Sequence, residues 1–250
     1  MSKYKTDGGR WQMKGIYDIH SHILPGLDDG ARDMEDTMET LREAVRQKIQ
    51  GIIATPHFHP GKFLTDSGQV LSVLRQVQEE CRKENLEIRL YPGHECYYYS
   101  GLVQSLKEGQ ALTLAGSRYV LVEFSPNCLY SYMQQGLEEL WRNGYQPILA
   151  HFERYACLGK KENLLHLREQ GVLLQMNLGR LQGKDTFFRK NPWGRLVKEG
   201  LVDYLATDCH GIYFRPMEAW RSYPWIEKNL SPERQKKIFV TNVKKIVKNE

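Results

Sequence analysis

The segment Asp18-Ile19-His20-Ser21-His22 ends a strand-like apolar run that begins at Ile16. Because residues i and i+2 of a strand point to the same side, His20 and His22 can present two imidazoles to one site. Similar apolar runs recur along the chain, separated by helical segments. Together with residues 16–20 they cover residues 51–55, 88–91, 119–124, 147–151, 172–176 and 202–207. Regular alternation of this kind predicts parallel strands joined by crossover helices.

The number of these units favours an α/β barrel over a doubly wound sheet. Seven strand–helix units follow one another, and no glycine-rich dinucleotide fingerprint follows the first strand. In an α/β barrel the carboxyl ends of all strands meet on one face, where active sites form. We therefore expect the functional residues to lie just after the strands.

Apolar residues at helical spacing predict the intervening helices. Met38, Leu41, Val45 and Ile49 recur at this spacing, and Gly51 is the expected stop. Further helices are expected over about residues 69–83, 134–142, 161–169 and 231–248. The last of these begins with Ser-Pro-Glu, which is typical of an N-cap serine with proline at the first helical position.

Composition indicates an ordinary water-soluble globular protein of 250 residues, with 41% hydrophobic residues and a net charge of +5. No apolar run reaches the roughly 18 residues that a membrane helix needs, and we expect neither membrane insertion nor nucleic-acid binding. Five cysteines without a CxxC spacing favour a reducing, cytoplasmic location over a disulfide framework. We expect residues 1–15 to be a flexible N-terminal arm and residues 16–250 to form a single domain.

Potential metal ligands follow almost every predicted strand. They are His20, His22, His57, Glu95, Glu123, His151, Asp208 and His210, and Asp29 on the loop 27–30 is a ninth candidate. Imidazole nitrogen and carboxylate oxygen without sulfur suit zinc, manganese or iron. Nine ligands exceed the needs of one ion, so the sequence predicts two or three.

A positively charged, open cluster of this kind suits a phosphate ester. Arg154 and Arg215 follow two of the ligand-bearing strands, and arginine offers a bidentate fork to phosphate oxygens. Tyrosines at 97–99, 130 and 132 could wall the site and stack on a phenyl ring, or some could pack between barrel and helices. We expect His59, His94 and His166 to be surface or supporting residues.

The motifs together resemble the PHP (polymerase and histidinol phosphatase) superfamily. They are Asp18-Ile19-His20-Ser21-His22-Ile23-Leu24-Pro25, Asp28-Asp29-Gly30, Ala54-Thr55-Pro56-His57, Gly93-His94-Glu95, Val122-Glu123-Phe124, Ala150-His151-Phe152-Glu153-Arg154-Tyr155 and Asp208-Cys209-His210. Within that superfamily the chain is similar to the bacterial manganese-dependent protein tyrosine phosphatases of capsule and exopolysaccharide operons. The resemblance runs from residue 16 to about residue 249, and its departures remove no ligand.

This resemblance implies a distorted (β/α)7 TIM-like barrel with three divalent ions, Mn2+ first, with Fe or Zn as alternatives. It implies that His20, His22, Glu95 and Asp208 hold one ion. Glu95, Glu123 and His151 would hold the second, and Asp29, His57 and His210 the third. Arg154 and Arg215 would bind phosphate. The implied substrate is phosphotyrosine on the C-terminal tail of a bacterial tyrosine kinase that controls polysaccharide chain length and export.

Three alternatives remain open on the sequence. A histidinol-phosphate phosphatase of the same superfamily would carry the same ligands. Cys209 and Arg215 fit the C-x5-R spacing of cysteine-dependent tyrosine phosphatases, although the loop between them lacks their glycine-rich character. The third alternative is a binding scaffold without catalysis. The native metal and the oligomeric state are left open.

Overall fold

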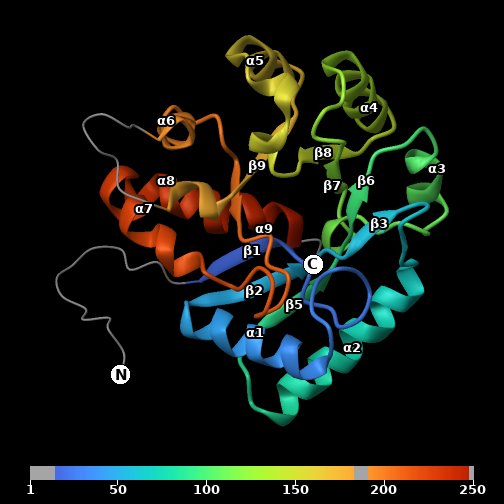
Figure 1. Cartoon of the computed structure of the whole chain (residues 1–250), viewed down its shortest axis with the longest axis vertical. Helices are drawn as coiled ribbons and strands as arrows, with labels where there is room; N and C mark the ends of the chain where they lie inside the picture. Colours follow the sequence, from blue (N-terminus) through green and yellow to red (C-terminus); the bar gives the residue numbers. More distant parts are fainter. Residues whose placement is uncertain (1–14, 183–190, 248–250) are drawn as a thin grey trace.

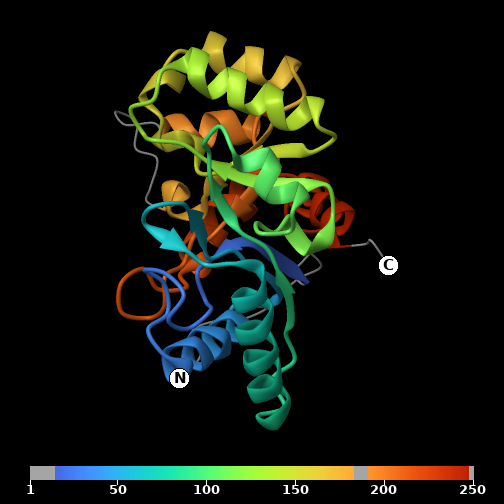
Figure 2. The ribbon, with the colours of Figure 1, turned by 90° about the vertical axis from the view of Figure 1, so that its right-hand side faces the viewer.

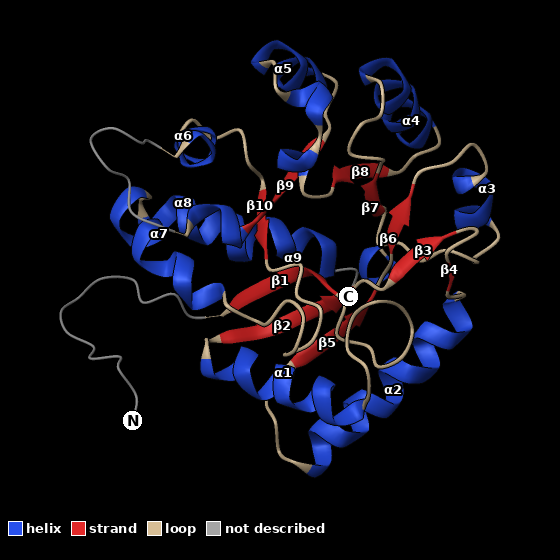
Figure 3. Cartoon of the chain, in the orientation of Figure 1, coloured by secondary structure: helices blue, strands red, loops and turns tan. Residues whose placement is uncertain are grey.

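Parallel strands occupy the centre of the fold and helices surround them (Figure 3). The computed structural model describes residues 15–182 and 191–247. One sheet has the order β1 (Ile16–Ser21), β2 (Ile49–Ala54) and β5 (Arg89–Pro92). The other has the order β10 (Tyr204–Ala206), β9 (Leu173–Asn177), β8 (Gln146–Leu149), β7 (Tyr119–Glu123), β6 (Glu95–Tyr97), β3 (His57–His59) and β4 (Phe63–Leu64). All neighbours are parallel except β3 and β4. The predicted α/β fold with parallel strands is confirmed.

Two of the seven expected strands bend and continue as a second short strand, which the sequence did not reveal. After β2, Thr55 and Pro56 interrupt the ladder, and β3 follows. Proline lacks the N–H group that a ladder needs. After β5, Gly93 approaches its neighbours so closely that a Cβ atom would lie 2.9 Å from Leu114 Cδ2. Both bends place a candidate ligand at the start of the new strand, where His57 pairs with Glu95.

The two sheets are joined where β1 ends. Ser21 forms a parallel bridge with Cys209, which lies just beyond β10. The backbone N–H of His22 donates to the carbonyl of Cys209 at 2.8 Å, and that of Asp208 donates to the carbonyl of His20 at 2.9 Å. The first and last strands therefore bring their ligand-bearing ends side by side.

Helices cover the outside of both sheets (Figure 1). Their bounds are α1 (Met34–Arg46), α2 (Ser67–Lys83), α3 (Leu102–Lys107), α4 (Tyr130–Arg142), α5 (Lys161–Glu169), α6 (Pro192–Lys198), α7 (Tyr223–Asn229), α8 (Pro232–Lys236) and α9 (Asn242–Val247). Figure 2 shows α4 and α5 together at one end of the molecule, with α1 and α2 at the other. Within the described residues no helix is long and apolar enough to cross a membrane.

Two helix predictions need correction, and three helices were not predicted. The first helix ends at Arg46, because Lys48 adopts a φ of 68° and Gly51 already lies in β2. A Cβ atom on Gly51 would lie 2.5 Å from the Tyr17 ring, so this glycine serves close strand packing. The expected helix 231–248 is broken by a π-helical turn at Lys237–Thr241. Helices α3, α6 and α7 were not expected, and the arm predicted for residues 1–15 lies outside the described residues except for Gly15.

Other predictions are confirmed at atomic detail. Ser231 accepts a hydrogen bond from the backbone N–H of Arg234 and caps α8, with proline at its first turn. Along β7, alternate residues face different layers of the core: Leu121 packs in the smaller apolar cluster, whereas Val120 and Val122 pack in the larger one with residues of α4. Glu123 is two residues beyond Leu121, so period-two alternation places it on the Leu121 side.

Candidate metal centre

All nine sequence-predicted ligands converge on one face, where β1, β7, β8 and β10 end and β3 and β6 begin, with Asp29 on the loop that follows β1. Three sets have ligand atoms within 4.8 Å of one another: His20, His22, Glu95 and Asp208; His22, Asp29, His57 and His210; and His57, Glu95 and Glu123. His151 joins them, because its Nε2 atom lies 2.7 Å from Glu95 Oε1 and 3.6 Å from Glu123 Oε2. Residues separated by up to 190 positions in the chain thus form one cluster.

Glu95 lies at the centre of this cluster. Its Oε2 atom is 3.1 Å from the Nε2 atoms of both His20 and His22, and 3.3 Å from His57 Nδ1. The side chain is buried, which by itself would raise its pKa. Nearby His20 and His151 outweigh burial and hold the pKa of Glu95 well below its usual value. A carboxylate in this position can be shared between neighbouring cations.

Three histidines are oriented by oxygen atoms behind them. His22 Nδ1 lies 2.6 Å from Asp28 Oδ2, and His20 Nδ1 lies 3.0 Å from Gln175 Oε1. His210 Nδ1 lies 3.0 Å from the carbonyl oxygen of Asp208. Each of these oxygens can accept a hydrogen from Nδ1, which leaves the Nε2 lone pair directed into the cluster. Metal-ligating histidines are commonly held by such partners.

The donor atoms fit divalent cations. The Nε2 atoms of His20 and His22 are only 3.3 Å apart, and both approach the same oxygen of Glu95. If both Nδ1 atoms carry the hydrogens, two lone pairs and a carboxylate face one point, and a cation there removes their repulsion. His57 Nδ1 is buried 3.1 Å from Glu123 Oε1 without a hydrogen bond. Nitrogen and oxygen donors without thiolate suit manganese, iron or zinc.

The backbone at two ligands adopts a rare conformation. His151 has a φ of 31° and Asp208 a φ of 54°, both in the left-handed region that residues with a Cβ atom seldom occupy. Such strain is concentrated at functional sites, where surrounding structure enforces it. Here it turns each chain sharply after its strand, so that Arg154 and Arg215 can follow the ligands over the cluster.

Arg154 and Arg215 converge on a single carboxylate. Arg154 Nη2 and Arg215 Nη1 each lie 2.6 Å from Asp208 Oδ2. Their side chains are 32% and 35% exposed, so both can reach a ligand from solvent. Both also line a cavity of about 250 Å3 together with His57, Glu95 and other members of the cluster. The cavity therefore has acidic and imidazole donors at one side and guanidinium groups at another.

The expected tyrosine wall is mostly absent. Tyr97 lines the cavity, together with Phe63 and Phe124. Tyr98 is buried and its hydroxyl donates to Glu139 at 2.6 Å. Tyr99 pairs with Ser105, and Tyr130 pairs with His166. Tyr132 contacts the rings of Tyr98 and Phe124. Tyr98, Tyr99 and Tyr130 are buried or half-buried and pack against neighbouring elements, whereas Tyr132 is 45% exposed.

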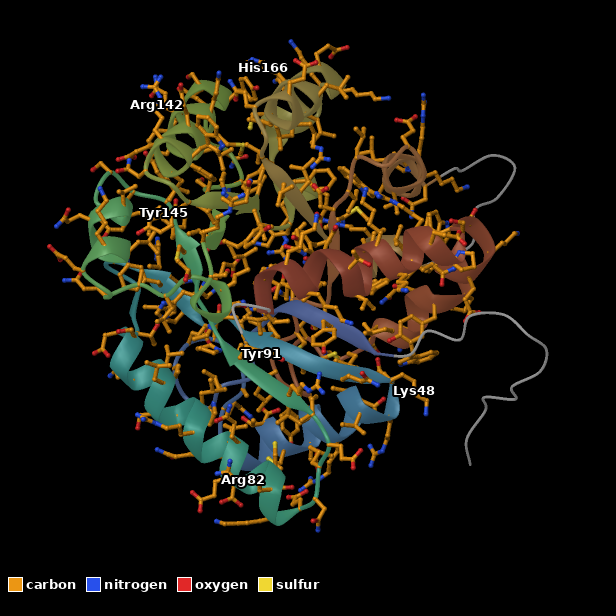
Figure 4. All side chains as sticks on the ribbon, turned by 180° about the vertical axis from the view of Figure 1, so that it is seen from behind. Lys48, Arg82, Tyr91, Arg142, Tyr145 and His166 are labelled. Atoms are coloured by element: carbon orange, nitrogen blue, oxygen red, sulfur yellow. The ribbon has the colours of Figure 1, made fainter. Side chains whose placement is uncertain are left out.

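The three histidines left out of the ligand set have different places. His59 lines the edge of the cavity, with its ring 4.0 Å from that of Tyr97. His94 is fully buried, and its Nδ1 accepts from the backbone N–H of Leu112 at 2.9 Å. Burial lowers the pKa of His94 to about 4. His166 lies on α5, away from the cluster (Figure 4).

Several supporting residues escaped sequence reasoning. Asn177 donates to Asp208 Oδ2 at 2.7 Å and Gln175 to Asn177 Oδ1 at 2.9 Å. Their i, i+2 spacing at the end of β9 was a usable signal, although neither side chain is a common ligand. Asp36 accepts from the backbone N–H of Ile212 at 2.8 Å and holds the loop that carries Arg215. No local pattern indicates that contact, because the two residues meet only through the fold.

Cys209 is unsuited to nucleophilic catalysis. Its side chain is fully buried in the apolar core, and burial raises the pKa of the thiol well above its usual value. A cysteine nucleophile reacts as the thiolate and needs an exposed, electropositive setting. The structure thus removes the cysteine mechanism that the C-x5-R spacing had left open.

Comparison with known proteins gives consistent relatives. The family described as "Capsular polysaccharide synthesis, CpsB/CapC" matches residues 16–248. Tyrosine-protein phosphatase YwqE of Bacillus subtilis is 35% identical over 219 residues, covering 87% of this chain and 86% of YwqE. Tyrosine-protein phosphatase CpsB of Streptococcus pneumoniae is 30% identical over 241 residues, covering 94% of this chain and 99% of CpsB.

Solved structures agree at the level of the fold. One, from a study of YwqE and CpsB as "unique metal-dependent tyrosine phosphatases", superposes with a TM-score of 0.84 at 33% identity, covering 94% of this chain and 95% of that chain. The phosphotriesterase homology protein of Escherichia coli, in complex with phosphate, superposes with a TM-score of 0.58 at 11% identity, covering 95% and 100% of the two chains. At that identity the likeness shows the fold alone.

Proposed function

The chain belongs to the CpsB/CapC family of capsular polysaccharide synthesis, and we propose on that basis that its cluster hydrolyses phosphotyrosine on the tail of a bacterial tyrosine kinase. It is a metal-dependent tyrosine phosphatase like its relatives. One observation carries the proposal: two guanidinium groups meet at one carboxylate of a nine-residue cluster of nitrogen and oxygen donors. Side chains that can ligate cations and side chains that can donate hydrogen bonds to phosphate thus border the same cavity.

The ligand assignment is part of this proposal. His20, His22, Glu95 and Asp208 would hold one divalent ion, which agrees with the way their donor atoms gather. Glu95, Glu123 and His151 would hold a second, and Asp29, His57 and His210 a third. Glu95 is shared by the first two sites in this assignment, because its Oε2 lies 3.1 Å from His20 and His22 and its Oε1 lies 2.7 Å from His151. Mn2+ is the proposed native metal, with iron and zinc as alternatives.

Divalent ions at this cluster would supply Lewis acidity, a water of lowered pKa and neutralisation of phosphate charge. Arg154 and Arg215 would bind the non-bridging phosphate oxygens through charge-assisted hydrogen bonds. To do so they would exchange part of their contact with Asp208 for the substrate. The side-chain oxygens of Asp28 and Gln175 would hold the rings of His22 and His20 in place during turnover. Neither Asp28 nor Gln175 has to move for the substrate to bind. The arginines therefore act on the substrate, whereas Asp28 and Gln175 act through the ligands.

The shape of the cavity favours an aryl phosphate. Phe63, Tyr97 and Phe124 line it, and these rings can contact a phenyl group by stacking or edge-to-face packing, worth about 0.5–1.5 kcal/mol beyond area burial. The Phe63 ring already stacks on His57, with centroids 5.4 Å apart and planes at 8°. A phosphoserine side chain carries no ring, so we expect it to gain none of these ring contacts.

Turnover of three substrates tests the proposal. We expect a phosphotyrosine peptide to be hydrolysed with a far higher kcat/KM than the matching phosphoserine peptide or histidinol phosphate. Equal rates on the two peptides would remove the tyrosine assignment. Faster hydrolysis of histidinol phosphate would support the other phosphatase of the superfamily. No turnover of any ester, including p-nitrophenyl phosphate, by metal-replete protein would support a scaffold.

We also propose that the two sheets together form one distorted (β/α)7 barrel. Two observations support it. Strands β2 and β3, and likewise β5 and β6, are separated by only two residues and continue each other across the sheet boundary. The bonds between Cys209 and the end of β1 link the opposite edges. The proposal includes a single domain of residues 16–250 and a cytoplasmic location, which the five free cysteines support.

A further inference from the structure

A second cavity of about 350 Å3 adjoins the metal cavity, and Arg154 and Arg215 line both. None of the nine proposed ligands is among its described lining residues. Apart from Arg154, which follows β8, the lining residues come from the end of β9 and from the segments after β9 and β10, and they include Arg180, Gln182 and Phe214. A ligand held by the two shared arginines therefore borders this second space directly.

Arg180 gives this cavity a cation that the proposed phosphate site does not use. Its side chain is 46% exposed, and its Nε atom lies 3.6 Å from Glu153 Oε1. That distance is long for a hydrogen bond. Arg154 and Arg215, by contrast, are each 2.6 Å from Asp208. Arg180 is thus the lining cation whose charge is least neutralised by the described residues.

The carboxylates nearby do not cancel this charge. Glu153 is buried, and its Oε1 atom also accepts from the backbone N–H of Asn177 at 3.2 Å. Glu218 is the one carboxylate among the described lining residues, and it pairs with Arg221 at 2.8 Å. The second cavity therefore has an excess of positive charge.

We propose that the second cavity is a subsite for the substrate peptide, in which Arg180 recognises an acidic side chain close to the phosphotyrosine. The inference rests on the proposed function, because the phosphotyrosine must occupy the metal cavity. An extended peptide advances about 3.3–3.6 Å per residue, so a neighbouring residue is carried only a short way past the shared arginines. Phe214, which is 75% exposed at the rim, offers apolar surface to the intervening chain.

The test compares phosphotyrosine peptides that differ only by Asp, Ala or Lys at each flanking position. The wild type is expected to prefer Asp over Ala at one or two positions, by about two- to fivefold in kcat/KM. Arg180→Ala should bring the ratio of kcat/KM between the Asp and Ala peptides close to one. Arg180→Glu should make the Lys peptide the better substrate. Because each ratio is measured within one preparation, it does not depend on the fraction of folded enzyme.

Arg142→Ala is the matched control. Arg142 lies on α4, is 71% exposed and lines neither cavity (Figure 4). Arg142→Ala removes one positive charge, as Arg180→Ala does, but outside both cavities. It should therefore keep the wild-type ratio of kcat/KM between the Asp and Ala peptides. Three results would contradict the proposed subsite: no preference of the wild type for Asp over Ala, an unchanged preference in Arg180→Ala, or a loss of that preference in Arg142→Ala to the same extent as in Arg180→Ala. Hydrolysis of p-nitrophenyl phosphate without hydrolysis of any phosphotyrosine peptide would instead overturn the proposed function, and this inference with it.

Discussion

The carboxylate of Asp28 lies 2.6 Å from the Nδ1 atom of His22, with both side chains buried. The same oxygen accepts from the backbone N–H of His57 at 2.8 Å, and the other oxygen accepts from Gly30 at 2.9 Å. Burial opposes ionisation of Asp28, but His22 outweighs it and holds the pKa of this carboxyl below its usual value. One aspartate thus fixes a ligand ring and two loops that carry further ligands.

Asp28→Asn should weaken metal retention by about 10- to 100-fold, the usual effect of removing a partner behind a ligand. The amide keeps the size of the side chain but supplies no carboxylate to His22. Competition with a chelator, followed by elemental analysis, measures the loss. Asp33→Asn is the control, because Asp33 caps α1 and asparagine caps a helix equally well. Unchanged metal affinity in Asp28→Asn would show that the contact is structurally incidental.

Removal of metal should abolish hydrolysis of p-nitrophenyl phosphate. In the proposed mechanism, divalent ions held by four carboxylates and five imidazoles supply the water of lowered pKa, and the buried Cys209 cannot take its place as the nucleophile. Dialysis against EDTA followed by addition of single metals measures the effect, and Mn2+ is expected to restore the highest rate. Full activity in protein shown by elemental analysis to be metal-free would contradict the mechanism.

Arg154→Ala or Arg215→Ala should lower kcat/KM for phosphotyrosine peptides by one to three orders of magnitude, about 1.4–4 kcal/mol of transition-state binding. Metal content should not change, because neither arginine is a ligand. Arg142→Ala is a suitable control, since Arg142 is 71% exposed on α4 and lines neither cavity. Wild-type kcat/KM in both variants would exclude these arginines from phosphate binding.

Cys209→Ser should retain most of the activity. The backbone of Cys209 contributes to the fold by accepting from His22 and bridging to Ser21, and substitution leaves those contacts intact. Since a hydroxyl in an apolar setting can lower stability, Cys209→Ala provides a second variant. A loss of several orders of magnitude in either variant, when folded and metal-replete, would revive the thiol mechanism.

Gly136→Ala should destabilise the protein even though alanine is the better helix former. A Cβ atom at this position of α4 would lie 2.6–2.7 Å from atoms of the Tyr98 ring, which Glu139 holds through the hydroxyl. Overpacking costs about 1–3 kcal/mol and outweighs the gain in helix propensity of about 1 kcal/mol. Denaturant unfolding measures the difference, with exposed Gln135→Ala on the same helix as control. A rise in stability for Gly136→Ala would mean that the ring can move.

Strand and ligand positions were readable in the sequence because each depends on local pattern. Apolar runs ending in His20, Glu123 or Asp208 predict both a strand and the face to which its last residue points. Because crossover helices join the strands in parallel, the carboxyl ends of the strands all lie at the same edge of the sheet. For that reason eight of the nine candidate ligands could be named from the ends of predicted strands, whereas Asp29 was inferred from the loop 27–30.

Tertiary structure alone decided how the ligands are supported and what surrounds them. The contact of Asp28 with His22, the two arginines on Asp208 and the second cavity beside Arg180 join segments that no sequence period relates. The bends after β2 and β5, and the burial of Tyr98 where a substrate wall was expected, depend likewise on packing between distant elements. The local sequence pattern determines the face of a strand to which a side chain points. The residues that this side chain contacts depend on how distant elements pack in the whole fold.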